Sequence, residues 1–109
     1  MIPAHEARII ADKIKPLFKN IRGDHYKLQI IDSKQNKQYT IFFSRQPKNG
    51  SMIVNPVYTI DEYKLEHLEN VLNELENYYK FTQEYRGFVG QLWPSNGNPV
   101  QFRKESREL

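Results

Sequence analysis

The residues best suited to chemistry are Asp32 and the stretch Glu62-Tyr63-Lys64, which places a lysine two positions after a carboxylate. Carboxylate oxygens bind Mg²⁺, and a nearby lysine can stabilise the negative charge that develops on a phosphate during its cleavage. If folding brought Asp32 next to Glu62 and Lys64, the three side chains would have the composition of a magnesium-dependent nuclease site. The elements that carry them decide whether such a site forms.

No other residues suggest catalysis or a bound cofactor. The chain has no cysteine, and its histidines, His5, His25 and His67, have no second histidine at helical ligand spacing. We expect His67 and its neighbour Glu66 on a solvent-exposed helix surface. The glycines occur singly, with no Gly-Lys-Ser/Thr signature of a phosphate loop. The sequence therefore predicts no catalytic residue, no metal site and no cofactor.

Basic side chains form the first candidate contact surface. Residues 1–58 hold ten Lys and Arg against four Asp and Glu, whereas residues 59–84 hold two against seven. Such segregation gives the protein one surface that attracts anions and another that repels them. The predicted basic face consists of Arg8, Lys15, Lys19, Arg22, Lys27, Lys37 and Arg45.

An aromatic arm near the C-terminus forms the second candidate surface. Aromatic and arginine side chains are enriched among binding hot spots, and aromatic rings also stack on bases. The arm consists of Tyr85, Arg86, Phe88, Trp93, Phe102 and Arg103. Its rings can serve as a contact surface or complete the core, and the sequence leaves both possibilities open.

The elements that must position these residues begin with a helix at Pro3, because proline suits the first helical position. Apolar residues recur at steps of three and four over residues 7–21, which puts the basic residues on another face of that helix. Pro16 should kink or restart the helix near Lys15, and Gly23 should end it.

Alternating apolar residues then predict strands over residues 26–30 and 39–43, which form a hairpin. The turn signal at 47–50, which contains Asn-Gly, leads to a third strand at 52–54. Pro56 cannot donate to a strand ladder, so this third strand should end there or lie at an edge. These segments predict a three-stranded antiparallel sheet.

A long second helix should follow, because Thr59-Ile60-Asp61-Glu62 matches a capping box and an apolar stripe runs over residues 65–82. Residues 88–93 then predict a C-terminal strand or extended arm. We expect an α+β fold in the order α-β-β-β-α-β, with one domain over residues 1–102 and a charged tail over residues 103–109.

This order of elements resembles the core of metal-dependent nucleases that carry an aspartate and a Glu-x-Lys pair. The resemblance implies a magnesium site made by Asp32, Glu62 and Lys64. In that family the Glu-x-Lys pair lies on a strand, whereas here it falls in the predicted first turn of the second helix.

Two RNA-binding modules also resemble parts of the chain. The double-stranded RNA-binding domain shares the order of elements and docks the start of its second helix on phosphates through lysines, where this chain has Asp61 and Glu62. The stretch 86–93 begins like the aromatic RNA-binding strand of the RRM fold, but Val89 and Gly90 stand where that motif has a small residue and an aromatic one.

The sequence therefore favours a small, non-enzymatic binding or regulatory protein. We expect it to dock on a macromolecular partner, either a protein or a nucleoprotein complex, through the basic face and the aromatic arm. Direct and largely sequence-independent binding of DNA or RNA is the alternative, and a metal-dependent nuclease is the third reading. No run is apolar enough to span a membrane, which favours a cytoplasmic protein without a membrane partner, and the apolar flank of the second helix is compatible with a homodimer.

Overall fold

In the computed structural model, which describes residues 1–105, helix α1 (Pro3–Ile14) begins at the expected proline but ends earlier than expected. Pro16 lies two residues past its end, where it has no N–H to donate to Asp12, and only a single further turn follows, closed by the Phe18 N–H and the Ile14 carbonyl at 2.9 Å. The expected continuation of the helix to Gly23 is wrong. Lys19 and Arg22 therefore lie in an irregular loop rather than on a helical face.

Strands β1 (His25–Ser33), β2 (Gln38–Gln46) and β3 (Ile53–Ile60) form the antiparallel meander that the alternating pattern predicts. β3 continues through Pro56, which an edge strand tolerates because it has a partner strand on one side only. The edge position expected for this strand is confirmed. The expectation that these three strands form the whole sheet is wrong.

Within the described residues the sheet has five strands of mixed direction, in the order β3-β2-β1-β4-β5. β4 (Thr82–Arg86) pairs in parallel with β1, and β5 (Arg103–Lys104) pairs antiparallel with β4. Residues 103 and 104 therefore belong to the sheet, whereas residues 106–109, which complete the expected charged tail, lie outside the described residues. β4 was missed because four of its five residues are buried and no alternation of polar and apolar residues marks it.

Helix α2 (Leu65–Leu75) is shorter than expected at both ends. Thr59 and Ile60 do not cap it but finish β3, where they pair with Thr40 and Tyr39 of β2. β-branched residues suit a strand, and here pairing outweighs the capping pattern. Lys64 occupies the N-cap position and makes no side-chain capping hydrogen bond, so the predicted capping box is wrong.

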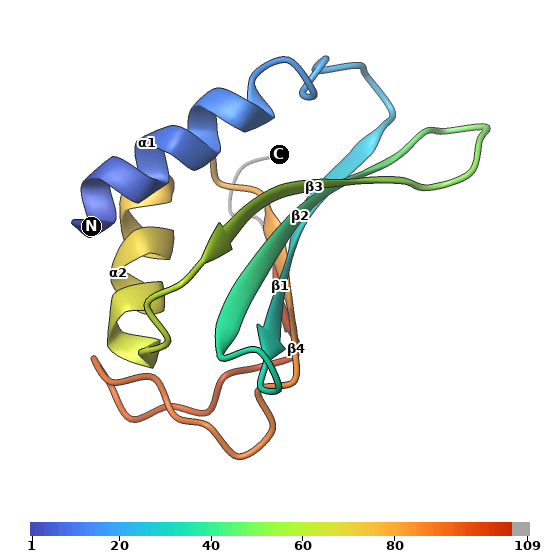
Figure 1. Ribbon diagram of the computed structural model, residues 1–109. Helices are drawn as coiled ribbons and strands as arrows, with labels where there is room; N and C mark the ends of the chain where they lie inside the picture. Colours follow the sequence, from blue (N-terminus) through green and yellow to red (C-terminus); the bar gives the residue numbers. More distant parts are fainter. Residues whose placement is uncertain (106–109) are drawn as a thin grey trace.

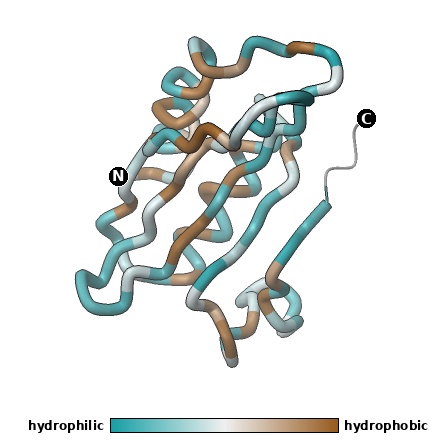
Figure 2. Tube along the Cα trace, turned by 90° about the vertical axis from the view of Figure 1, so that its right-hand side faces the viewer, coloured by the Kyte–Doolittle hydropathy of each residue, from teal (hydrophilic) through white to brown (hydrophobic). Residues whose placement is uncertain are grey.

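The molecule has two layers, with both helices on one face of the sheet (Figure 1). α1 and α2 pack against each other, and the core lies between them and the sheet. Figure 2 shows the sheet from the opposite side, where the strands lie in front of the helices and no described element covers them. Neither helix within residues 1–105 is long and apolar enough to cross a membrane. Fully buried core side chains include Ile10, Ile14, Leu28, Ile30, Ile41, Phe43, Ile60, Leu68, Leu75 and Phe88.

Candidate functional site

The aromatic arm divides between the core and the surface. Phe88 is 2% exposed, stacks on Tyr39 with ring centroids 5.9 Å apart, and meets the edge of Tyr85 at 5.7 Å. Burial, together with the charges of nearby glutamates, raises the pKa of Tyr85 above its ordinary value. Trp93 is half-buried and packs edge-on against Tyr85 at 5.5 Å. Phe88 and Tyr85 therefore belong to the core, whereas Trp93 remains partly open to solvent.

Four predicted basic residues are exposed but spread over separate elements. Arg8 lies on α1, Lys15 caps the end of that helix and Lys19 lies in the following loop. Lys37 lies in the β1–β2 turn, in a left-handed backbone conformation with φ of 53°. None of the four lines the cavity described below.

Three other basic residues meet around Glu84 on the open face of the sheet. The Glu84 carboxylate lies 3.1 Å from the Lys27 ammonium, 3.5 Å from the Arg103 guanidinium and 3.9 Å from that of Arg86. Arg86 also lies over the ring of Phe102, at 5.4 Å from its centroid. Burial opposes ionisation of Glu84, but the hydrogen bond and charge of Lys27, followed by Gln29 and Arg103, outweigh it and lower the pKa of this carboxyl. These four ionised groups form a compact network of local charge +2.

A cavity of about 700 Å³ adjoins this network. It lies where β1 and β4 begin and β2 ends, next to the loop that follows α1. Phe18, Tyr26 and Phe81 line it, and these rings pack on one another, with Phe18 4.7 Å from Tyr26 and 5.0 Å from Phe81 between centroids. Lys27 and Arg103 of the charged network also line the cavity. Aromatic walls next to cations suit a ligand that has both apolar and anionic groups.

The loop residues Ile21 and Arg22 and the β3-proximal Met52 also line this cavity. Ile21 and Met52 are each 44% exposed and border the same cavity, so their apolar surfaces are grouped rather than scattered. Arg22 has no ion-pair partner within residues 1–105, whereas Arg45 is engaged by Asp24 at 2.7 Å. The cavity therefore combines exposed apolar surface with an available cation. We call this cavity, whose lining includes Ile21, Arg22 and Met52, the loop cavity.

A buried polar network links the two helices to β3, and no motif in the sequence predicts it. Glu6 of α1 accepts a hydrogen bond from Tyr58 Oη at 2.8 Å and contacts His67 of α2, which also lies 3.4 Å from Glu62. The prediction that His67 lies on a solvated surface is wrong, because it is 6% exposed. Burial and the hydrogen bond to Glu6 raise the pKa of Tyr58 to about 12. The only sequence signal was the position of Glu6 beside Ala7 and Ile10 on the apolar side of α1.

The carboxylates of the nuclease hypothesis take part in separate contacts. Asp32 accepts hydrogen bonds from Tyr63 Oη at 2.6 Å and Gln91 Nε2 at 2.7 Å, whereas Glu62 contacts His67. The hydrogen bond to Asp32 raises the pKa of Tyr63. In the described part of the chain, no group of three or more His, Asp or Glu side chains is placed to hold a metal ion.

The chain was compared with protein-family models, with curated proteins and with solved structures, and it matches none of them.

Proposed function

We propose that this chain is a non-enzymatic binding protein that docks on another protein through the loop cavity. The observation that carries the proposal is the exposure of Ile21 and Met52 beside Arg22, a cation without an ion-pair partner among the described residues. Contiguous exposed apolar side chains mark interaction sites, and arginine is enriched at their energetic centres. The matching partner segment carries an apolar side chain for the cavity and a carboxylate for Arg22.

The apolar surface continues from the loop cavity along the start of β3. Ile53 and Val54 follow Met52 and are each 45% exposed. β3 is also an edge strand, so its outer side offers backbone N–H and C=O groups that another strand can pair with. An extended partner segment paired with β3 would therefore run beside Ile53 and Val54 and end next to Met52 of the loop cavity.

The charges near the cavity favour a protein over a nucleic acid. Lys27 and Arg103 are paired with Glu84, and Arg103 also lies 2.6 Å from Glu105. A phosphate backbone gains affinity from cations that are free to replace its counterions, and cations already held by carboxylates contribute little to that gain. Arg22, which has no ion-pair partner among residues 1–105, and its apolar neighbourhood suit a peptide segment better.

The test begins with affinity capture from the source organism and identification of the retained protein. The binding constant of the purified partner is then measured by calorimetry for the parent protein and for Met52→Asp and Arg22→Glu. We expect each variant to weaken binding at least about tenfold, because one buries a charge in the apolar contact and the other reverses the ion pair.

Two matched controls carry the same chemical changes elsewhere. Val89→Asp alters a side chain that is 94% exposed, and Arg8→Glu alters an exposed arginine of α1; neither residue lines the cavity. Both controls should bind within about twofold of the parent, in keeping with the small effects of surface changes outside a contact. Unchanged affinity in both cavity variants, with their folding confirmed by circular dichroism, would refute the proposal.

A further inference from the structure

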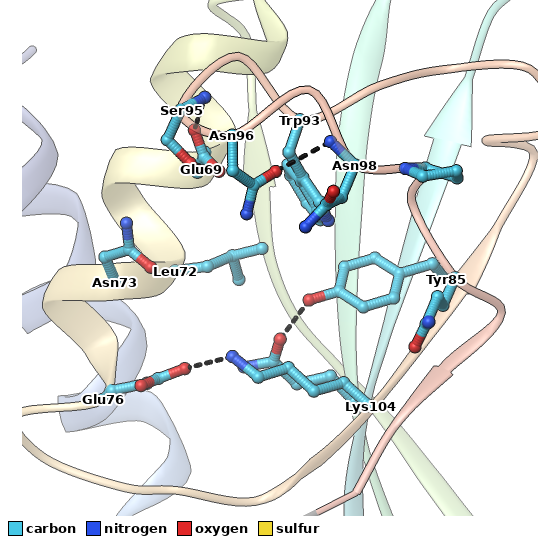
Figure 3. Close-up of a pocket in the computed structure, with 13 residues that line it drawn as sticks. Glu69, Leu72, Asn73, Glu76, Tyr85, Trp93, Ser95, Asn96, Asn98 and Lys104 are labelled. Atoms are coloured by element: carbon cyan, nitrogen blue, oxygen red, sulfur yellow. Dashed lines mark hydrogen bonds and ion pairs between the residues drawn. The ribbon is translucent and has the colours of Figure 1, made fainter.

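A second pocket lies on the helix side of the sheet, between α2, β4 and the segment that precedes β5 (Figure 3). Its volume of about 420 Å³ lies within the range of roughly 300–1,000 Å³ that is usual for small-molecule sites. The pocket shares no lining residue with the loop cavity.

The wall opposite α2 is held in place by several hydrogen bonds. Glu69 of α2 accepts from the backbone N–H of Ser95 at 3.1 Å and from its hydroxyl at 2.7 Å. The backbone N–H of Trp93 donates to the backbone carbonyl of Asn98 at 2.8 Å, and the backbone N–H of Asn98 donates to the side-chain oxygen of Asn96 at 2.9 Å. The segment is therefore positioned before any ligand arrives, which lowers the entropic cost of binding.

Three carboxamides around this pocket make no hydrogen bond to other groups within residues 1–105: Asn73, Asn98 and Gln101. Each carboxamide offers an N–H₂ donor and a carbonyl acceptor. A hydroxyl group also donates and accepts, so a ligand with several hydroxyls can satisfy both functions of such side chains. The charged members of the wall are already engaged, because Lys104 donates to Glu76 at 2.7 Å.

The apolar side of the pocket is small and well defined. In Figure 3, Leu72 and the ring of Tyr85 point into the space, with Trp93 beside Tyr85. The Tyr85 hydroxyl donates to Gln83. Aromatic side chains present an apolar surface that suits the C–H face of a ring.

The charge of the pocket argues against an anionic ligand. Glu69 and Glu76 outnumber the single cation, Lys104, so the site is negative by one charge. A phosphate or carboxylate would meet this charge without a free cation to receive it. Glu69 already accepts from Ser95 and Glu76 from Lys104, so a cation finds no unengaged carboxylate either, and the fitting ligand is uncharged.

We propose that this pocket binds a neutral, hydroxyl-rich ring, that is, one residue of a carbohydrate. The hydroxyls bond to the carboxamides of Asn73, Asn98 and Gln101, and the C–H face of the ring lies against Trp93 and Tyr85. This site acts independently of the loop cavity.

The chain contains a single tryptophan, so the emission of Trp93 reports on this pocket directly. The probes are glucose, galactose, mannose and N-acetylglucosamine, with adenosine and inorganic phosphate as competing ligand classes. We expect a saturable change in emission with at least one sugar. Asn73→Ala should then raise the dissociation constant about threefold to tenfold, the usual effect of removing one hydrogen bond.

Asn70→Ala is the matched control, because Asn70 is exposed on the same helix but does not line the pocket. It should bind the sugar like the parent, and both variants should keep the parent's melting temperature. The proposal is overturned if no sugar changes Trp93 emission, if only adenosine or phosphate does, or if Asn73→Ala and Asn70→Ala bind equally well. Weaker sugar binding by Asn73→Ala, together with unchanged sugar binding by Met52→Asp, would show that this site is separate from the loop cavity.

Discussion

At the scale of single residues, Glu84 is the carboxylate on which the open face depends. It is 4% exposed and joins residues of β1, β4 and the C-terminal segment through Lys27, Gln29 and Arg103. A buried acceptor with several donors contributes more than a surface ion pair, because its partners lose their bonds when it is removed. The basic residues of the network are thus part of the fold as well as of the surface.

This network makes a prediction about pH. The folded state lowers the pKa of Glu84 below its ordinary value of 4.5, so Glu84 stabilises the protein above that pH, and the contribution is lost as the pH falls through the lowered value. Glu84→Gln should cost about 1–2 kcal/mol at pH 7, measured by urea unfolding. The difference from the parent should shrink as the pH falls below 4.5.

Glu66→Gln provides the comparison, since Glu66 is exposed on α2 and has no ion-pair partner within residues 1–105. Its effect should stay under about 0.5 kcal/mol at every pH. A Glu84→Gln difference that does not change between pH 7 and low pH would show that shape, rather than charge, sets the cost of this variant.

The residues of the candidate site were only partly predictable. Arg22, Lys27 and Arg103 were expected at a contact surface because of their charge, and all three line the loop cavity. Ile21 and Met52 were not expected there, because an apolar residue in a sequence gives no sign of whether the core will cover it. The apolar spacing over residues 7–21 places Ile21 on the apolar stripe of the predicted first helix. Because α1 ends at Ile14, Ile21 is exposed instead.

At the scale of elements, the start of α2 shows how two local signals can compete. The same residues, Thr59 and Ile60, suit a helix cap and a strand end, and pairing with β2 decides between them. The meander was predictable because its strands alternate between a covered face and an open one. The end of α2 was not predictable, because Tyr79, Phe81 and Tyr85 continue a helical spacing, although Tyr79 and Phe81 lie in the irregular segment after the helix and Tyr85 lies in β4.

The uncapped start of α2 leads to a stabilising substitution. Lys64 has the extended backbone of an N-cap, with φ of −134° and ψ of 127°, but its side chain accepts no hydrogen bond from the first turn. Lys64→Ser supplies an acceptor for the N–H of Glu66 or His67 and should stabilise the fold by about 1 kcal/mol relative to Lys64→Ala.

Thermal unfolding followed by circular dichroism checks this prediction. The serine variant should melt roughly 4–8 °C above the alanine variant, as expected for that free energy in a domain of this size. Equal melting temperatures for the two variants would mean that the first-turn N–H groups are satisfied without a side-chain acceptor.

At the scale of the whole molecule, the central difference from the expected fold is the position of β4 in the sheet, next to β1. Sequence reasoning joined neighbours along the chain, whereas β1 pairs with a strand 55 residues further on, as the partners Lys27 and Thr82 show. That pairing brings Lys27 to Glu84, and the pairing of β5 with β4 adds Arg103 beside the same carboxylate at the loop cavity. Long-range strand order leaves no local pattern, so this part of the site could not be predicted.

The charge of the whole molecule also predicts weak nucleic-acid binding. The net charge is +3, and most cations near the open face are paired with carboxylates. Fluorescence anisotropy with labelled single- and double-stranded DNA and RNA should show binding at low salt only, and none at about 150 mM. Tight binding at about 150 mM that Arg22→Glu removes would place nucleic acid ahead of a protein partner.

The insertion of β4 beside β1 also determines when the protein can fold during synthesis. A nascent chain that has reached residue 60 contains the whole meander, whose contacts are local in sequence. β1 nevertheless remains an edge strand until residues 82–86 have left the ribosome, because β4, its parallel partner, is synthesised after the meander. The pairing of β4 with β1 joins residues far apart in the sequence, so it should be the slow step in folding. Until it occurs, β1 is open to pairing with other chains.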